Sequence, residues 1–210
     1  YAFASGQLED GLFAGELSEN TLLMAKIAEK HREPVSVQPG ADSAGGALGA
    51  AICAMKDLNQ KTQLRYSLAD LGFGPGFCNE DIELVLKKYK LKYNYIIDAS
   101  AYAARDLANG LLVAWFQGRM EMGSKALGNR SIFANPSIAG VKERINEDIK
   151  HRQPWQQFSA SVTSEYAKNV FGIQKVSPYM GFSFSVSPKL KELFLYPNQI
   201  HEFDFCSFCC

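Results

Sequence analysis

The chain has 210 residues, of which 47% are apolar and 12% aromatic, so it can bury a hydrophobic core in one or two globular domains. Its 22 basic side chains balance 22 acidic ones, which excludes a whole-protein field that would attract nucleic acid or an anionic membrane. No run approaches the ~18–20 apolar residues of a membrane span. We therefore expect neither a nucleic-acid partner nor a membrane partner.

The first residue and the cysteines bear on two questions, whether sequence is missing upstream and in which compartment the protein works. It begins with Tyr1 rather than Met, in a segment that reads as the middle of a domain, so we expect further sequence upstream. Five cysteines without a regular framework favour a reducing compartment, and we expect a cytoplasmic protein. Cys206 and Cys209 lack the second matching pair of a zinc site, so we assign them no function.

Helix and strand signals alternate in the first part of the chain. Apolar spacing predicts a helix over residues 20–31 with Asn20 as its cap, and then a short strand at Val35–Val37. A glycine turn at residues 39–43 leads into a second helix over 44–58. The Ala and Gly content of this helix indicates close packing against neighbouring backbone.

A shift in composition marks a domain boundary. Residues 59–67 are polar, and a new glycine motif begins at Gly72, so we place the boundary near Tyr66. The expected domains are therefore 1–66 and 67–210.

The second part predicts further helices and a strand. Helices are expected over residues 79–89, capped by Asn79, and over 101–109, ended by Gly110. The unbroken apolar run 111–116 has the length of a strand and fits one that is buried on both faces. Helices that alternate with strands imply an α/β fold.

The segment after this strand concentrates groups that suit a phosphate. Residues 118–131 contain three glycines, three cations and a carboxylate. Glycines let backbone amides approach an anion, and Arg and Lys donate charge-assisted hydrogen bonds to phosphate oxygens. The residues alone leave open a solvated loop in which Arg130 and Glu121 pair with each other.

The segment resembles the signature of the NodU/CmcH family of carbamoyltransferases, Gly-Arg-Met-Glu-Phe-Gly-Pro-Arg-Ala-Leu-Gly-Asn-Arg-Ser-Ile. Twelve of its fifteen positions agree with residues 118–132. Further resemblance is found at residues 38–39, 45–51, 145–146, 150–152, 155–162 and 177–180.

The resemblance implies a two-domain enzyme and its chemistry. A Kae1-like domain of the actin/Hsp70 ATPase fold precedes a YrdC-like α/β domain in this family, and the chain would hold the end of the first, 1–66, and part of the second, 67–210. The YrdC-like domain forms carbamoyladenylate from carbamoyl phosphate and ATP with Mg. The Kae1-like domain then transfers the carbamoyl group to a hydroxyl of a small molecule beside a bound iron (Fe).

This resemblance predicts an enzyme fragment that is incomplete for activity by itself. The alternative is a degenerate, non-catalytic homologue that still binds nucleotide. Threonylcarbamoyl transfer to transfer RNA shares the folds but favours a basic surface, which a zero net charge does not indicate.

Residue by residue, the resemblance makes Lys125 and Lys150 the catalytic cations on carbamoyl phosphate and nucleotide. The expected substrate- and nucleotide-binding residues are Arg119, Glu121, Asn129, Arg130, Ser131 and Arg152. Cations among them would neutralise the charge that builds between two phosphate-bearing substrates. The alternative is that Lys150 and Arg152 end a helix over residues 141–149 and complement its dipole.

Departures from the family pattern bear on this prediction. Lys125 replaces an Arg, which keeps the charge but loses the bidentate fork, and Gln156 replaces another Arg and loses the charge. Glu16 stands at the second glycine of a Gly-Gly turn, where a phosphate is expected.

Asp42 is the candidate iron ligand of the first domain. It lies one residue early against the family's register, in which Ser43 occupies the expected place, and its histidine partners would lie upstream of Tyr1. An ordinary loop or Asx-turn role for Asp42 stays open.

Overall fold

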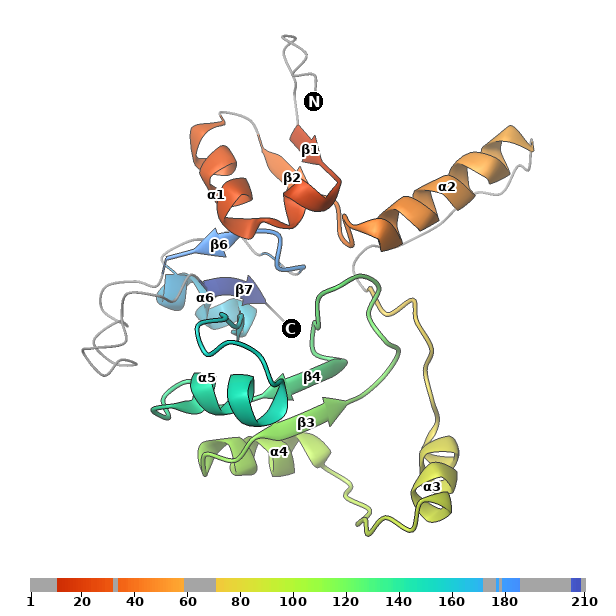
Figure 1. Ribbon diagram of the computed structural model, residues 1–210, viewed down its shortest axis with the longest axis vertical. Coiled ribbons are helices and arrows are strands. Elements are labelled where there is room, and N and C mark those ends of the chain that lie inside the picture. The colour runs from red at the N-terminus through yellow and green to blue at the C-terminus, as the bar shows by residue number, and fades with distance from the viewer. Residues whose placement is uncertain are drawn as a thin grey trace.

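The computed structural model describes residues 11–31, 34–58, 71–171, 177, 179–185 and 205–208, the last range by its backbone alone. Short strands and helices alternate along these ranges (Figure 1), which confirms the mixed α/β character expected from the sequence. The boundary expected near Tyr66 lies outside the described residues. The domain division therefore stays a prediction.

A parallel strand pair carries the first part of the chain. Its elements are β1 (Gly11–Phe13), the 3-10 helix η1 (Glu16–Glu19), α1 (Thr21–Lys30) and β2 (Val35–Val37). β1 pairs with β2, and η1 and α1 form the crossover that parallel strands require. Asn20 caps α1 as expected, because its side-chain oxygen accepts a hydrogen bond of 3.0 Å from the Leu23 amide.

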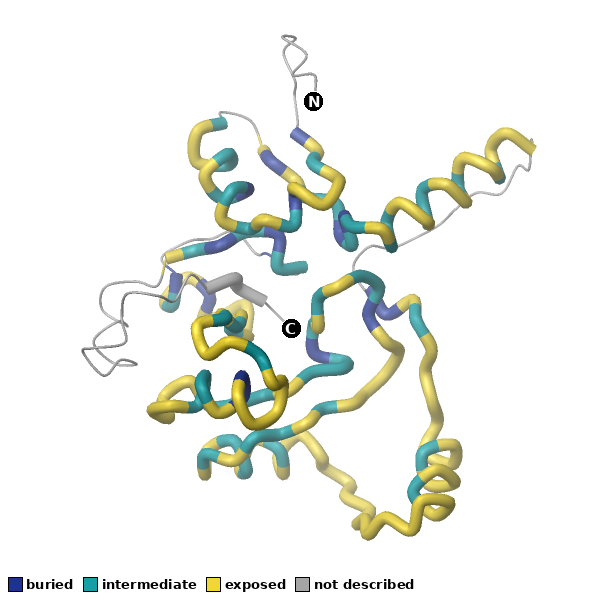
Figure 2. The backbone as a smooth tube through the Cα atoms, viewed as in Figure 1, coloured by how far each residue is buried: buried dark blue, intermediate teal, exposed yellow. Residues whose placement is uncertain are grey.

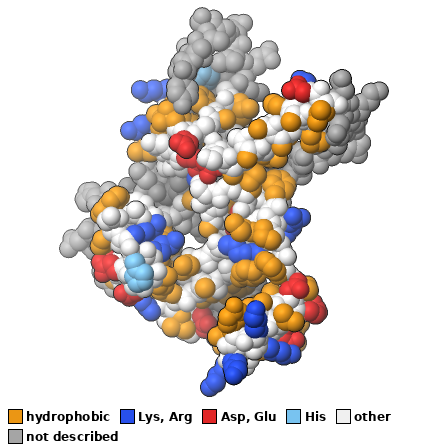
Figure 3. Space-filling view, turned by 45° about the vertical axis from the view of Figure 1, so that its right-hand side comes forward, with side chains coloured by type: hydrophobic (Ala, Val, Ile, Leu, Met, Phe, Trp, Pro, Cys, Tyr) orange, Lys and Arg blue, Asp and Glu red, His pale blue; other side chains and the backbone are white. Residues whose placement is uncertain are grey.

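Helix α2 (Ser43–Asp57) projects from the rest of the structure (Figure 1). It buries none of its residues, and Figure 3 shows apolar side chains open along it at the upper right. Among the described residues, the expected close packing is found at its first turn, where a Cβ on Gly45 would overlap the Gly40 carbonyl oxygen.

The second part is built on an antiparallel strand pair. Its elements are α3 (Asn79–Lys88), α4 (Ala99–Ala108), β3 (Val113–Phe116), β4 (Arg130–Phe133), α5 (Val141–Arg144) and the π-helical turn η2 (Ile145–Ile149). β3 pairs with β4, and α4 lies along β3 (Figure 1). Residues of β3 alternate between half-buried and exposed, so the prediction of a strand buried on both faces is wrong. Such alternation is typical of a strand pair with one open face.

The predicted helices of this part are confirmed, with corrections at their first residues. Asn79 is the first residue of α3 and not its cap. The cap is Cys78, whose amide donates a hydrogen bond of 3.1 Å to the Asp81 carboxylate. α4 begins two residues earlier than expected, after Asp98, and Gly110 follows its end with a φ of 80°.

A three-stranded sheet brings distant segments together. Its strands are β5 (Ala160–Ser161), β6 (Ser183–Phe184) and β7 (Phe205–Phe208), and α6 (Ser164–Phe171) follows β5. β7 lies between the other two, parallel to β5 and antiparallel to β6. The Phe171 ring of α6 lies 6.2 Å from the Phe184 ring. Because β6 also contacts α1, this late segment lies against the first part of the chain (Figure 1).

Within the described ranges, buried residues occur in short stretches spread over several elements (Figure 2). The buried apolar residues of the described ranges are Met24, Val35, Ala41, Leu71, Ile145, Ala167 and Phe171. None of the helices in these ranges combines the length and the apolar character that a membrane crossing requires.

We expect Met24→Ala to lower the free energy of unfolding by about 2 to 5 kcal/mol, because it leaves a cavity where α1 faces β2 and β6. Met24 is 2% exposed. Leu22→Ala on the same helix is the matched control, since Leu22 is 43% exposed and should lose far less. Urea unfolding measures both, and equal losses would contradict the buried position of Met24.

Candidate functional site

A buried carboxylate organises the signature loop. Oxygen Oε1 of Glu121 accepts hydrogen bonds from three backbone amides, those of Leu127 at 2.8 Å, Asn129 at 2.7 Å and Arg130 at 3.2 Å. The loop between these residues therefore closes on its own acidic side chain.

The Glu121 carboxyl stays ionised in this setting. Burial favours its neutral form, but the backbone hydrogen bonds outweigh burial and hold the pKa of Glu121 below its ordinary value. The negative charge is therefore part of the folded loop.

The two arginines of the signature bind backbone carbonyls. The Arg119 guanidinium donates to the carbonyls of Gly74 at 2.8 Å and Phe73 at 3.0 Å. The Arg130 guanidinium lies 3.6 Å over the Phe116 ring. Its carbonyl acceptors are Gln117, Gly118, Asn129 and Pro75. Both side chains hold the loop to the segment that precedes α3.

These contacts use three backbone amides of the loop, because those of Leu127, Asn129 and Arg130 donate to Glu121. Phosphate binding by the loop stays a prediction. The alternative pairing of Arg130 with Glu121 is wrong in its side-chain form, since the contact uses the Arg130 amide. Asn129 and Ser131 complete the network, because Asn129 Nδ2 donates to the Arg119 carbonyl and Ser131 Oγ accepts from the Gly128 amide.

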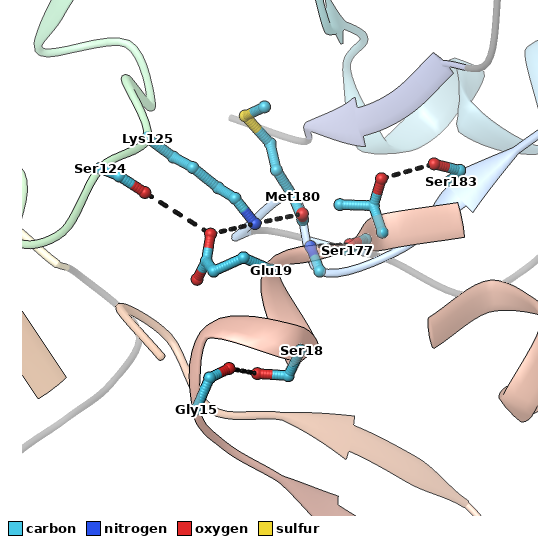
Figure 4. A network of polar contacts seen from close by, with 10 residues as sticks. Gly15, Ser18, Glu19, Ser124, Lys125, Ser177, Met180 and Ser183 are labelled. Atoms are coloured by element: carbon cyan, nitrogen blue, oxygen red, sulfur yellow. Dashed lines mark hydrogen bonds and ion pairs between the residues drawn. The ribbon is translucent and has the colours of Figure 1, made fainter. Parts of the chain in front are cut away.

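Lys125 extends from the same loop toward other parts of the chain (Figure 4). Its ammonium lies 3.0 Å from Glu19 Oε2 on η1 and donates a hydrogen bond of 3.0 Å to the Met180 carbonyl. Ser124 Oγ approaches the same Glu19 oxygen at 3.5 Å. Lys125 therefore joins three segments that are far apart in the sequence.

Close backbone contacts support this junction. A Cβ on Gly123 would lie 3.1 Å from the Gly40 Cα, and both glycines have positive φ, of 98° and 60°. Side chains larger than hydrogen would push the two turns apart. Thr21 and Ser183 share a hydrogen bond of 2.6 Å nearby, which ties β6 to α1 (Figure 4).

A second polar cluster surrounds Asn146, which is 0% exposed. Its Nδ2 donates to the carbonyls of Pro154 at 3.0 Å and Gln156 at 2.9 Å, and its Oδ1 accepts from Arg152 Nε at 2.6 Å. The Arg152 guanidinium also lies 4.7 Å over the Phe158 ring. Asn146 thus shapes the turn that carries Lys150.

Lys150 follows η2 and is exposed. Within the described ranges, no residue pairs with its ammonium or accepts a hydrogen bond from it. The structure thus brings Arg130 and Ser131 into one network, directs Lys125 to Glu19, and leaves Lys150 in a separate turn. Their convergence on one bound substrate stays a prediction.

Asp42 serves as the cap of α2, where its Oδ1 accepts a hydrogen bond of 2.9 Å from the Ala44 amide. Across the part of the chain that the structure describes, no three His, Cys, Asp or Glu side chains are grouped to hold a metal ion. These residues do not form an iron site by themselves, so iron binding at Asp42 stays a prediction. Glu16 is exposed on η1.

Sequence reasoning missed two residues of the site. Asn146 belonged to a segment of family resemblance, but it stands among polar and charged residues, so the pattern did not mark it as buried. Glu19 carried no signal, because nothing in a short acidic segment indicates a partner more than a hundred residues away.

We expect Glu121→Gln to lower the free energy of unfolding at neutral pH by about 1 to 3 kcal/mol, because it weakens hydrogen bonds to a charged acceptor. A lowered pKa in the folded state means that this contribution is present above the unfolded value, near 4.5, and is lost as the pH falls through the folded value. Urea unfolding between pH 7 and pH 3 should thus show a smaller acid-induced loss in Glu121→Gln. Glu147→Gln, at an exposed site, is the control, and identical pH curves for wild type and Glu121→Gln would contradict the role of this carboxylate.

Comparisons with known proteins agree with the resemblance. Residues 104–203 match the family described as Carbamoyltransferase C-terminus. The chain is 34% identical over 200 residues to an uncharacterised protein of Synechocystis, covering 91% of this chain and 32% of that protein. It is 36% identical over 176 residues to Nodulation protein NolO of Bradyrhizobium diazoefficiens, covering 80% of this chain and 32% of that protein. It is 31% identical over 151 residues to 3'-hydroxymethylcephem-O-carbamoyltransferase of Amycolatopsis lactamdurans, covering 71% of this chain and 27% of that protein.

The chain spans about a third of the length of the curated relatives that it matches. The matched family region includes both Lys125 and Lys150, together with the network around Glu121. Residues 104–203 therefore form a region of the chain that belongs to the carboxy-terminal domain of carbamoyltransferases.

Proposed function

We propose that the chain is part of an ATP-dependent carbamoyltransferase that forms carbamoyladenylate and passes the carbamoyl group to a hydroxyl of a small molecule. Carbamoyl phosphate, water and ATP with Mg are its substrates: water cleaves carbamoyl phosphate to carbamate and phosphate, and a carbamate oxygen then attacks the α-phosphorus of ATP and releases pyrophosphate. The family match and the O-carbamoyltransferase named among the relatives support carbamoyl transfer. In this proposal residues 1–66 belong to a Kae1-like domain and residues 67–210 to a YrdC-like domain.

The observation that carries the proposal is that the arginines and the lysines of these motifs have different hydrogen-bond partners. Guanidinium groups of Arg119 and Arg130 donate to backbone carbonyls and hold the loop. The Lys125 ammonium has three N–H donors and two described acceptors, and the Lys150 ammonium has no described acceptor. The lysines are therefore the cations of these motifs that suit phosphate oxygens.

Each lysine has a defined part in this chemistry. A fixed cation stabilises charge that develops between transferring groups, and it is more effective when its position is set before the reaction. Lys125 is fixed by Glu19 and Met180, and Lys150 stands on a turn that Asn146 shapes. Mg bound with ATP would neutralise part of the phosphate charge.

A degenerate homologue that binds nucleotide without turnover is the second candidate. Glu19 neutralises one of the two cations, and Gln156 brings no charge where the family has Arg. Both features reduce the positive charge available to two anionic substrates.

We expect Lys150→Ala to lower carbamoyl-phosphate-dependent pyrophosphate release from ATP by roughly 10²–10³-fold in the complete enzyme, because one preorganised charge is lost. Lys168→Ala removes an exposed lysine of α6 and should leave the rate unchanged. Pyrophosphate release is measured with and without carbamoyl phosphate. Release that does not depend on carbamoyl phosphate in the wild type would reject the enzyme in favour of the nucleotide-binding homologue.

Gln156→Arg should raise this rate or lower the KM for carbamoyl phosphate, since it restores a cation next to the turn that holds Lys150. The backbone of Gln156 already binds Asn146 and Gln153, so the exchange leaves these contacts in place. Gln156→Met, of similar length and without charge, is the control. Equal kinetics for Gln156→Arg and Gln156→Met would show that no anion binds near this position.

A further inference from the structure

Glu19 forms an ion pair with Lys125, one of the two cations that the proposed function assigns to phosphate. Its Oε2 lies 3.0 Å from Lys125 Nζ and 3.5 Å from Ser124 Oγ, so two neighbouring side chains of the signature loop meet one carboxylate oxygen (Figure 4). The side chains of Glu19 and Lys125 are 22% and 20% exposed. The contact is therefore sheltered but still reached by solvent.

A phosphate at Lys125 would meet this carboxylate. Within hydrogen-bond distance of one ammonium, two anions repel each other, and the repulsion is stronger in a partly buried site than in water. An ion pair with this exposure is also weak enough to open when a better partner arrives. Phosphate carries more charge than a carboxylate and more oxygens, which makes it the stronger partner.

The Met180 carbonyl makes this exchange possible without loss of the Lys125 position. It accepts a hydrogen bond of 3.0 Å from the ammonium, and the neighbouring Gly181 amide donates a hydrogen bond to Ser177 Oγ. When the Glu19 carboxylate is displaced, the hydrogen bond to the Met180 carbonyl still holds the Lys125 ammonium. η1, by contrast, loses its contacts with both Lys125 and Ser124.

We propose that Glu19 is an internal anion that pairs with Lys125 in the substrate-free protein and that carbamoyl phosphate displaces on binding. The ion pair holds the ammonium in the substrate-free protein, and the phosphate group of the substrate takes the place of the Glu19 carboxylate. Substrate binding on the signature loop thereby removes the contacts between this loop and Glu19 of η1. This inference rests on the proposed function, because it takes carbamoyl phosphate as the ligand of Lys125.

The test is a double-mutant cycle read by titration calorimetry with carbamoyl phosphate on the complete protein. Glu19→Gln should lower the Kd by about two- to fivefold, the factor that corresponds to a partly exposed ion pair. In a Lys125→Gln background the same exchange should have a much smaller effect, since the cation for which Glu19 and the phosphate compete is gone. Glu29→Gln on α1 removes an exposed carboxylate and should leave the Kd unchanged.

Kinetics separate displacement of Glu19 from a structural role. Glu19→Gln should lower the KM for carbamoyl phosphate, whereas a merely destabilised fold would not tighten substrate binding. Should Glu19→Gln not fold, Glu19→Asp provides the second variant. Its shorter chain weakens the pair, and its Kd should lie between those of wild type and the range expected for Glu19→Gln.

Failure of this inference differs from failure of the proposed function. If Lys125→Gln weakens binding and the Glu19 variants do not tighten it, displacement of Glu19 is overturned and the function stands. If Lys125→Gln leaves the Kd for carbamoyl phosphate unchanged, Lys125 does not bind the phosphate, and the inference is overturned together with this part of the proposed site.

Discussion

A carboxylate buried within a loop loses its hydration, and Glu121 replaces that hydration with three backbone amides on one oxygen. The amides come from the far end of the signature loop, so their convergence closes the loop and sets its shape. Ser124 and Lys125 lie at the bend between the two ends. The direction of the Lys125 side chain thus depends on an acidic residue that does not touch it.

The arginines and lysines of the signature differ in geometry as well as in role. A guanidinium presents several donors in a plane, which suits the ring of carbonyls around Arg130 and the pair beside Arg119. An ammonium on a flexible stem reaches outward, as Lys125 does toward Glu19. The number of cations in the motif therefore overstates the charge that it offers to a ligand.

The turn after η2 is built on the same physical principle. Asn146 is fully buried and satisfies its amide group with two carbonyls and the Arg152 guanidinium. Buried polar groups that are fully paired specify one backbone path, and this path leaves Lys150 exposed at its outer side. In both segments, a satisfied polar residue orders the backbone and a lysine remains toward solvent or a partner.

Local signals in the sequence determined the helices and the family. The side chain of Asn20 caps a helix that begins one residue later, and the positive φ of Gly110 follows the end of α4, so these features needed no distant contact. The signature of residues 118–132 likewise identified the family from its order of residues alone.

Only the tertiary structure decided which polar groups meet. An apolar run does not reveal whether a second layer covers it, and β3 keeps alternate residues exposed. Glu19 and Lys125 are brought together by the packing of η1, the signature loop and the 177–181 segment, and no local pattern encodes a contact across that separation. Local propensity follows from neighbouring residues, whereas the pairing of a charge follows from the whole chain path.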